Sequence, residues 1–252
     1  MTATDQTSRG TARGIADALR KQIRSGTLRP GQVLPTGREL ADTFNVSRKT
    51  ATAATDILKS EGLVIGEQGG RRRVRAVRRI TWDLSEFERG RRRDSHTLDD
   101  WATAIKNAGR EPRETIVRTV EPAEPQIAEW LRIMPGDEVV RRARVRWVDN
   151  EPYQLSTSYF PGTIARGTLL DGDREVSVPG GVLRHIGYPQ TSIRDEISTR
   201  MPSPEETEIL QLPVGTPVIQ HVRIGHGTES PVRVMVTIAP GDRHLLVYEM
   251  EV

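Results

Sequence analysis

The stretch TGRELADTFNVSRKTATAATDILK, residues 36–59, has the pattern of two short helices separated by one tight turn. Thr36 and Glu39 form the T-x-x-E pattern of a capping box, which satisfies the free N–H groups at the start of a helix. Asn45 ends this first helix, and the hydroxyl of Ser47 is suited to cap the second. Apolar residues at helical spacing give each helix one buried face. The stretch therefore predicts a helix-turn-helix.

Polar and cationic residues gather in the first turn of the second predicted helix, opposite its apolar face. A helix-turn-helix places the N-terminal residues of its second helix against base edges in the major groove. The candidate DNA-reading residues of this turn are Arg48, Lys49, Thr50 and Thr52. Double-stranded DNA is therefore the predicted partner of this part of the chain.

The sequence around the stretch supplies the rest of a winged helix-turn-helix over residues 1–77. Before it, Ile15, Leu19 and Ile23 recur every four residues, which predicts an amphipathic helix that packs behind the second helix. After it, residues 63–65 and 71–77 have the composition of two strands, and the glycine-rich segment GEQGG joins them.

This segment would form the tip of the wing. Glycines there let the backbone approach a duplex, and flanking arginines can reach phosphates or the minor groove. Strand alternation puts Arg71 and Arg73 on one face, so we add them to the candidate DNA-binding residues together with Gly69 and Gly70. A solvated run of arginines is the alternative for the RRR triplet.

Charge is divided unequally along the chain. Residues 1–80 contain 16 Lys and Arg against 7 Asp and Glu, whereas residues 81–252 contain 21 against 27. The basic part coincides with the helix-turn-helix, as binding to a phosphate backbone requires. The chain has no cysteine, which excludes disulfides and fits a reducing cytoplasm. No apolar run approaches the ~20 residues of a membrane span, and no signal peptide is recognisable, so we expect a cytoplasmic protein.

Residues 78–94 are interpreted as a linker, and residues 95–252 as a mixed α+β domain built on an internal repeat. Shifting residues 125–162 by 79 positions aligns prolines, glycines and apolar residues of the two copies without a gap. Each copy has the pattern of a short helix that begins at a proline, a turn and two strands. We expect the two copies to share one antiparallel sheet.

Three arginines alternate along the first strand of this repeat, VVRRARVRWV, residues 139–148. Period-two alternation places Arg142, Arg144 and Arg146 on one face of the strand. Planar guanidinium groups that face one way suit a carboxylate or phosphate ligand. The alternative is a solvent-facing surface of the sheet. The repeat aligns Arg144 with Arg223 of the second copy.

The N-terminal residues resemble the DNA-binding domain of GntR-type bacterial transcription regulators. The resemblance rests on LPTGRELA at 34–41, VSRKT at 46–50, EGLV at 61–64 and QGGRRRV at 68–74. It implies DNA contacts by Arg38, Ser47, Arg48, Thr50 and Gly69. Members of the family usually have arginine at the position of Thr52. Threonine lacks the guanidinium fork that reads guanine, so the operator is expected to differ at that base pair.

The C-terminal residues resemble the UTRA effector-binding domain of the HutC subgroup, whose fold is like that of chorismate lyase. The resemblance rests on RVRWVDNEP at 144–152, SYFP at 158–161, MPSPEE at 201–206 and LPVGTPV at 212–218. In members that sense sugar phosphates an R-x-R pair binds phosphate, which implies this role for Arg144 and Arg146. The candidate effector-binding residues are Arg142, Arg144, Arg146, Arg223, Arg233 and Tyr159.

Two departures from that subgroup leave the identity of the effector open. PGGV at 179–182 replaces the usual Ser-x-Tyr helix start, and Arg233 replaces a common glutamate. A sugar phosphate, a different anion, an antibiotic-like metabolite and no small ligand at all remain alternatives.

The main hypothesis is a homodimeric transcription regulator, usually a repressor in this family, that an anionic effector releases from a pseudo-palindromic operator. A constitutive repressor whose second domain only dimerises is one alternative. An enzyme fused to a DNA-binding module is another, but five histidines lack metal-binding spacing and no nucleophile elbow or P-loop occurs. Lys106 is the sole lysine of the acidic half, which argues against pyridoxal phosphate. We therefore predict no catalytic residue, metal or cofactor.

Overall fold

The computed structural model describes residues 10–66, 71–76, 79–84, 100–176, 178 and 180–249. The chain forms two compact units. The first contains residues up to 78 together with Leu212–Thr216, and the second contains the rest. Each unit has a hydrophobic core of its own, and each is described by itself. Among the described helices, none combines the length and the apolar character that crossing a bilayer requires.

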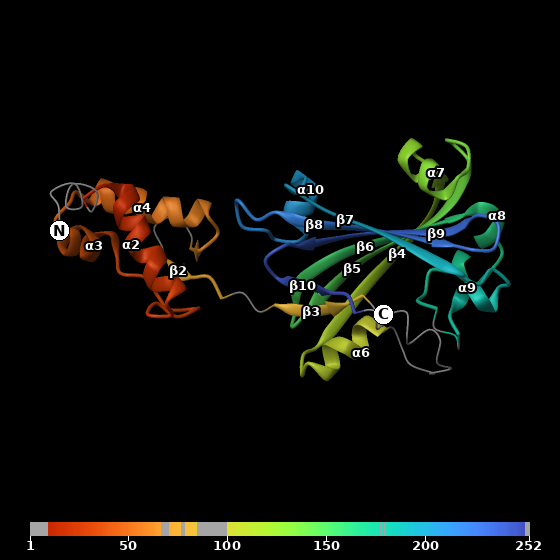
Figure 1. The fold of residues 1–252 in the computed structure, drawn as a ribbon, viewed down its shortest axis with the longest axis horizontal. Helices are drawn as coiled ribbons and strands as arrows, with labels where there is room; N and C mark the ends of the chain where they lie inside the picture. Colours follow the sequence, from red (N-terminus) through yellow and green to blue (C-terminus); the bar gives the residue numbers. More distant parts are fainter. Residues whose placement is uncertain are drawn as a thin grey trace. The chain divides into compact units, whose positions relative to one another are not determined.

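The described residues of the first unit form three helices and a two-stranded antiparallel sheet (Figure 1). The elements are α2 (Ala12–Arg24), α3 (Gly37–Phe44), α4 (Arg48–Ser60), β1 (Val64–Ile65) and β2 (Arg73–Val74). One apolar cluster joins them, and its largest members are Ile15, Leu19, Leu40 and Leu58. This is the predicted winged helix-turn-helix, although β2 is shorter than the predicted strand over residues 71–77.

Capping defines the ends of the two central helices. The Thr36 hydroxyl accepts from the backbone N–H of Glu39 at 3.2 Å, and the Glu39 carboxylate accepts from that of Thr36 at 2.7 Å. Asn45 ends α3 in the left-handed conformation, with φ of 52°. Ser47 then caps α4 by accepting from the backbone N–H of Thr50 at 3.1 Å. The capping residues that the sequence indicated are therefore confirmed.

The second unit is built on a six-stranded antiparallel sheet with the strand order β4-β5-β6-β9-β8-β7. Its strands are β4 (Pro112–Pro122), β5 (Glu138–Val148), β6 (Glu151–Pro161), β7 (Ser192–Arg200), β8 (Val218–His226) and β9 (Pro231–Pro240). Together with the helices of this unit, the sheet makes the mixed α and antiparallel-β fold that was predicted.

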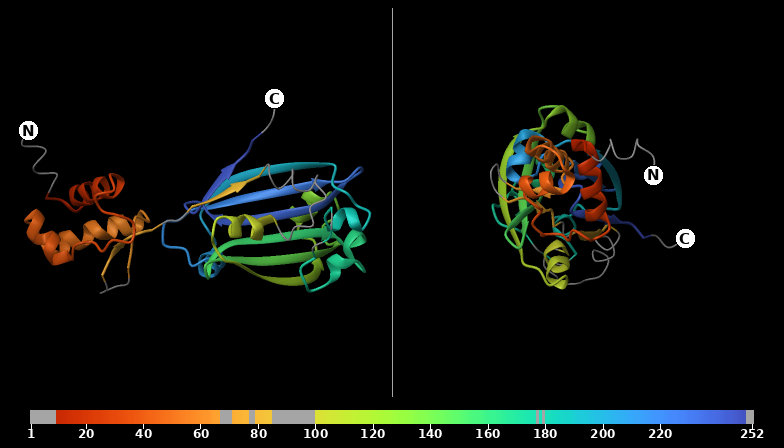
Figure 2. Two further views of the ribbon diagram at one scale, coloured as in Figure 1. Left: turned by 90° about the horizontal axis from the view of Figure 1, so that it is seen from below. Right: turned by 90° about the vertical axis from the view of Figure 1, so that its left-hand side faces the viewer.

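Helices cover the two faces of this sheet unequally (Figure 1). On one face, α7 (Pro125–Leu131) packs its apolar side on Val139, Val222 and Val234. On the other face, α8 (Gly162–Ala165) and α9 (Val182–His185) cover one end, and α6 (Asp100–Asn107) covers the opposite end. The second view agrees, since the yellow α6 lies over the near face of the strands (Figure 2). A 3-10 turn, η1 (Leu169–Asp171), follows α8, and α10 (Pro204–Ile209) precedes β8.

Part of the predicted linker over residues 78–94 belongs to the second unit. Residues Ile80–Asp83 form β3, which pairs in parallel with β10 (His244–Val247). The buried indole of Trp82 packs edge-on against His221, with the ring centroids 5.2 Å apart. Strand pairing and the buried Trp82 side chain attach these residues to the second unit. Residues 85–94, including the arginines at 91–93, lie outside the described part.

The helix and strands expected from the repeat occur in the same order in both copies. The set α7, β5, β6 begins at Pro125, and the set α10, β8, β9 begins at Pro204. Strands β6 and β9, the last of each set, pair at the centre of the sheet. We keep the repeat as an interpretation of this order.

Candidate functional site

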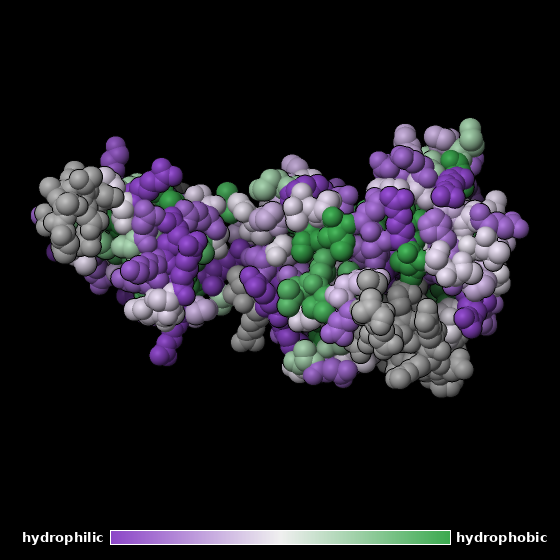
Figure 3. All heavy atoms as spheres, viewed as in Figure 1, coloured by the Kyte–Doolittle hydropathy of each residue, from purple (hydrophilic) through white to green (hydrophobic). Residues whose placement is uncertain are grey.

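The first turn of α4 carries the predicted reading residues at the surface of the first unit. The side chains of Arg48, Lys49 and Thr52 are exposed, as is Ser47, and Thr50 is half-buried. The hydroxyls of Ser47 and Thr50 lie 2.8 Å apart, so the cap also positions a second hydroxyl beside it. Hydrophilic side chains dominate much of the face of this unit that Figure 3 shows.

The start of α3 approaches the same turn of α4. A Cβ atom on Gly37 would lie 3.4 Å from the Thr52 hydroxyl, so the two helices are close at this point. Arg38 follows directly and is exposed. Hydrogen bonds from Thr36 lower the pKa of Glu39, and the positive charge of Arg71 adds to the effect. Arg38, Arg71 and the first turn of α4 thus belong to one basic surface.

Arg72 fixes the wing to α4. Its guanidinium donates to the hydroxyl of Thr55 and to the carboxylate of Asp56, the latter at 2.7 Å. The sequence analysis gave this residue no role, because strand alternation says nothing about which neighbour a side chain meets. Arg73 stays exposed and reaches the Gly31 carbonyl at 3.4 Å. Gly69 and Gly70 lie outside the described residues.

In the second unit, the face of the sheet opposite α7 is polar at its centre; we call it the polar face. The strand register places side chains from five strands in two adjacent rows. One row contains Arg118, Arg142, Ser158, Met235 and Arg223. The next contains Ile116, Arg144, Ser156, Thr237 and His221. The predicted alternation of Arg142, Arg144 and Arg146 is therefore what brings the three arginines to one face.

Arg142 is buried, with 1% of its side chain exposed. It donates to the carbonyl oxygens of Leu170, Gly172 and Arg174 at 3.0, 2.5 and 2.6 Å. Burial lowers the pKa of its guanidinium, and the nearby Arg144 adds to this. Arg142 therefore holds the segment that follows η1 over the sheet.

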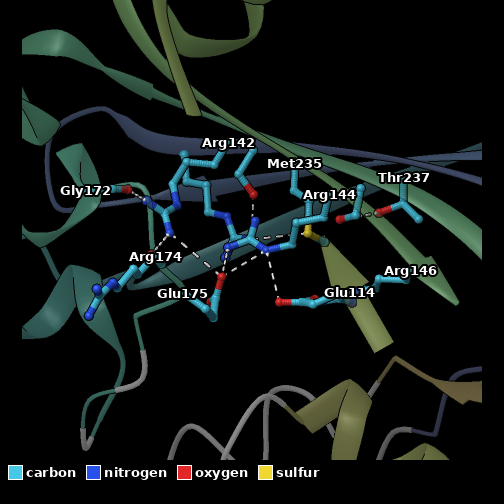
Figure 4. Close-up of polar contacts among 12 residues, drawn as sticks. Glu114, Arg142, Arg144, Arg146, Gly172, Arg174, Glu175, Met235 and Thr237 are labelled. Atoms are coloured by element: carbon cyan, nitrogen blue, oxygen red, sulfur yellow. Dashed lines mark hydrogen bonds and ion pairs between the residues drawn. The ribbon is translucent and has the colours of Figure 1, made fainter. Parts of the chain in front are cut away.

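Arg144 and Arg146 each meet a carboxylate (Figure 4). Arg144 donates to the Glu175 carboxylate at 2.6 and 3.1 Å. Arg146 donates to the Glu114 carboxylate at 3.0 Å, and its guanidinium lies 4.8 Å from the centre of the Trp101 ring. Figure 4 shows the side chains of Arg142 and Arg144 converging on Glu175. An anion that binds this R-x-R pair would compete with two internal carboxylates.

A second charged group lies farther along the polar face, on β7 and β8. The guanidinium of Arg223 donates two hydrogen bonds of 2.7 Å to the Asp195 carboxylate. His221 Nε2 lies 2.8 Å from the same carboxylate. Burial alone would raise the pKa of Asp195, but the hydrogen bonds from Arg223 and His221 outweigh it and hold that pKa well below its usual range. Sequence reasoning missed Asp195 and His221, because only the pairing of β7 with β8 brings them together.

Two further predicted effector residues have different surroundings. Arg233 lies on the polar face and donates to the Ser158 hydroxyl at 2.8 Å. Tyr159 does not join this group, because its neighbour Ser158 faces the arginines and alternation turns Tyr159 to the opposite face. There it packs in the apolar cluster under α7.

The two units together indicate a class of protein. They are typical of a transcription regulator that joins a winged helix-turn-helix to a second, effector-binding domain. Comparison with known proteins agrees. Residues 11–74 match the family described as bacterial regulatory proteins, gntR family, and residues 107–244 match the UTRA domain. The chain belongs to the gntR-family regulators that carry a UTRA domain.

Individual relatives extend over nearly the whole chain. An uncharacterised HTH-type transcriptional regulator of Streptomyces coelicolor is 28% identical over 95% of this chain and 92% of its own. The HTH-type transcriptional repressor NagR of Bacillus subtilis is 24% identical over 94% and 93%. A crystal structure of a GntR-family transcriptional regulator has 25% identity and a TM-score of 0.63, over 96% of this chain and 97% of its own. All are regulators, so the chain is a DNA-binding regulator and not an enzyme.

Proposed function

We propose that this regulator binds a pseudo-palindromic operator as a homodimer and is released by a small anionic effector bound on the polar face. A two-fold protein matches two half-sites about one helical turn, roughly 34 Å, apart. Arg48, Lys49 and Thr52 would read base edges, and Arg38, Arg71 and Arg73 would contact phosphates. The residues Ser47 and Thr50, and the wing glycines Gly69 and Gly70, complete the proposed DNA interface.

The charge balance of the polar face is the observation that carries the effector half of the proposal. Among the described residues, six arginines on this face lie among five carboxylates. The arginines are Arg118, Arg142, Arg144, Arg146, Arg223 and Arg233, and the carboxylates are Glu114, Asp171, Asp173, Glu175 and Asp195. An excess of guanidinium groups in a half-buried site favours a ligand that brings negative charge.

The centre of the same face supports a ligand that also bears hydroxyl or amide groups. Ser156 and Thr237 lie on neighbouring strands with their hydroxyls 3.4 Å apart, and Ser158 is one row away. These side chains are neutral donors and acceptors between the two charged groups. We therefore favour a small polar metabolite with one phosphate or carboxylate, held at Arg144 and Arg146.

Release would follow from a difference in effector affinity between the operator-bound and free forms. An anion at Arg144 would displace Glu175, which lies in the segment that Arg142 holds. The change in this segment is the local event on which release depends.

Fluorescence anisotropy on promoter DNA of the regulated genes tests the proposal, with phosphate- and carboxylate-bearing metabolites added in turn. We expect protection of an inverted repeat in a footprint, and an effector that lowers operator affinity for the native protein but not for Arg144→Ala. Arg141→Ala is the matched control, because its side chain leaves the opposite face of the same strand. Absence of a protected inverted repeat would contradict the DNA half of the proposal.

One observation favours the alternative of a constitutive repressor. Glu175 and Glu114 already satisfy Arg144 and Arg146, so the pair is stable without a ligand. A thermal-shift screen distinguishes the effector-released regulator from the constitutive repressor. A ligand at 100-fold its Kd stabilises the domain that binds it by about 2.7 kcal/mol, whereas a domain that only dimerises gives no shift with any metabolite.

A further inference from the structure

Three buried side chains of the second unit each have a nitrogen atom without a hydrogen-bond partner among the described residues. These atoms are Nε2 of Gln154 on β6, Nδ1 of His221 on β8 and Nε2 of His244 on β10. The exposed fractions of the three residues are 2%, 0% and 6%. A buried polar atom without a partner costs free energy, so each one in a native protein needs an explanation. We therefore ask which group would pair with these three atoms.

Gln154 and His221 lie on the polar face with one strand, β9, between them. Gln154 is opposite Arg146 in the strand register, and His221 is opposite Thr237, so both side chains face the same side as the arginines. On this side β9 carries the small side chains of Thr237 and Ala239. Small side chains on the middle strand leave the polar groups on either side within reach of one ligand.

His244 and Trp82 lie over this part of the face. They belong to β10 and β3, which run side by side in parallel (Figure 2). The Trp82 ring meets His221 edge-on, with the centroids 5.2 Å apart, and its centroid lies 6.5 Å from that of His244. His244 also packs on Tyr153, the neighbour of Gln154 in sequence, with 4.3 Å between the ring centroids. These ring contacts gather Gln154, His221 and His244 beneath Trp82, and we call the three residues the inner subsite.

The partners of the two imidazoles decide what the inner subsite can bind. His244 Nδ1 lies 3.0 Å from the Pro240 carbonyl oxygen, which can only accept, so Nδ1 carries the hydrogen. His221 Nε2 lies 2.8 Å from the Asp195 carboxylate, which also accepts, so Nε2 carries the hydrogen there. In a neutral imidazole the other nitrogen is then an acceptor. With the amide N–H of Gln154, the inner subsite offers two acceptors and one donor.

A ligand group that complements this set donates two hydrogen bonds and accepts one. Two neighbouring hydroxyls do so, and so does a primary amide. An ionised carboxylate or phosphate fits poorly, because its oxygens would face the lone pairs of both imidazoles. Burial adds to this effect, since an ionised group is costly to bury without a cationic partner. The group that fits the inner subsite is therefore neutral.

We propose that the inner subsite binds a neutral hydroxyl or amide end of the effector, whose anionic end is held at Arg144 and Arg146. The proposal rests on the proposed function and narrows the effector to molecules that have both kinds of end. Arg144 and His221 lie in the same row of the polar face, three strands apart, which corresponds to about 14 Å between their Cα atoms. Side chains reach inward from both ends of this distance, so a ligand the length of a six-carbon chain bridges it.

The cover over the inner subsite is a small sheet of its own. Strands β3 and β10 pair with each other over four residues each, and the six-stranded sheet contains neither of them. An isolated two-stranded sheet is marginally stable, so moving Trp82 aside costs less than opening the main sheet. Because β3 is the next strand after the wing in sequence, the same movement acts on the segment that joins the two units.

Matched probes test the inner subsite by isothermal titration calorimetry on the full chain in phosphate-free buffer. Sorbitol 6-phosphate and n-hexyl phosphate share an anionic end and a chain length, but only the former carries hydroxyls. Adipic acid monoamide and hexanoate are the corresponding pair for an amide. In at least one pair, the member with the neutral polar end should bind about 10-fold more tightly than its partner, which is the gain expected from a buried neutral hydrogen bond.

Two variants locate this gain in affinity. His221→Gln keeps an N–H for Asp195 at the position of Nε2 but has no counterpart of Nδ1, and Gln154→Leu removes the amide at similar volume. Each should weaken binding of the favoured probe by about 10-fold and leave binding of its partner unchanged. A variant that only disturbs the fold would weaken both members of the pair alike. His226→Gln, at a half-buried position of the same strand, is the control and should change neither.

Failure of the inner subsite and failure of the proposed function give different results. If the probes bind and Arg144→Ala abolishes their binding, yet neither pair shows a difference that His221→Gln removes, only the inner subsite is wrong. Solvent would then be the partner of the three nitrogen atoms. If neither the probes nor inorganic phosphate bind the native chain, or if Arg144→Ala has no effect on binding, the proposed effector site is wrong as well.

Discussion

Neighbouring arginines on one strand serve different purposes, and their surroundings decide which. Arg142, Arg144 and Arg146 share one face of β5, but Arg142 is buried under the segment that follows η1 and donates to three carbonyl oxygens. Arg144 and Arg146 hold carboxylates that are partly exposed. Only the latter two are available for exchange with a ligand, because a carboxylate can leave more readily than a carbonyl fixed in the chain.

Arg48 offers a test of base reading. Arg48→Ala should weaken operator binding by about 1–3 kcal/mol and relax the preference at one base pair, as expected for a guanidinium that contacts a base edge. Fluorescence anisotropy on the operator and on single-base variants measures both effects. Lys59→Ala is the control, because Lys59 is exposed at the opposite end of the same helix. Equal weakening on every sequence would make Arg48 a phosphate contact.

Because His244 is buried, its titration should make the stability of the second unit depend on pH. Burial lowers the pKa of its imidazole to about 4, although a hydrogen bond with the Pro240 carbonyl opposes the effect. The unfolded chain therefore binds this proton at a higher pH than the folded one, with an ordinary pKa near 6.5. Stability is complete above about pH 6.5 and falls as the pH drops toward 4, by about 2 kcal/mol between pH 7 and pH 5.

Tryptophan fluorescence in a denaturant titration measures this loss selectively, because all four tryptophans belong to the second unit. In His244→Gln the difference between pH 7 and pH 5 should shrink by most of that amount. His185→Gln, at an exposed position, should keep it. Asp195 does not interfere in this window, because its depressed pKa delays its titration to more acidic solution. An unchanged pH dependence in His244→Gln would assign the effect to another group.

At the scale of elements, η1 and the segment after it are held to the sheet by Arg142 and Arg144. The carbonyl oxygens of Leu170 in η1 and of Gly172 and Arg174 after it accept hydrogen bonds from Arg142. The segment contains Glu175, so the arginine that anchors it also positions the carboxylate that meets Arg144. Elements that are held by few contacts are the ones that a ligand can shift at low cost.

Arg142→Met should release this segment and destabilise the second unit by about 1–3 kcal/mol, because it leaves buried carbonyl oxygens without donors. Arg141→Met is a matched control, since Arg141 is half-buried on the other face and its nearest carboxylate oxygen, from Glu121, is 3.8 Å away. That change should cost less than 1 kcal/mol. Denaturant titration followed by tryptophan fluorescence compares the two. Equal losses in the free energy of unfolding for the two variants would show that Arg142 does not anchor this segment.

Capping and alternation are local sequence patterns, and they predicted the elements that contain them. Contacts between segments far apart in the sequence could not be predicted from such patterns. Thr36, Asn45 and Ser47 delimit α3 and α4 because a cap is a local hydrogen bond. The face shared by Arg142, Arg144 and Arg146 follows from period-two geometry alone. Strand β3 was missed because its partner β10 lies more than 150 residues later, and Asp195 because its partners come from β8. Tyr159 was proposed as an effector-binding residue, although alternation with Ser158 turns it away from the arginines.

At the scale of the whole molecule, charge is divided between the two units of the chain. The basic part coincides with the helix-turn-helix, and the acidic part with the effector-type domain. Repulsion between DNA and the acidic part limits non-specific contacts to the basic surface, so operator affinity depends on the phosphates that this surface neutralises. The division therefore makes a prediction about salt.

Operator affinity should fall steeply with salt, by roughly 10³-fold or more between 50 and 200 mM if a dimer neutralises six or more phosphates. Arg73→Ala should reduce the slope of log affinity against log salt by about 2, since a dimer loses one phosphate contact from each wing. Arg194→Ala provides the control, because Arg194 is exposed in the acidic domain and should leave the slope unchanged. Anisotropy titrations at four salt concentrations give each slope. A slope near zero would mean that base contacts and not phosphates dominate binding, and the basic surface would then need another explanation.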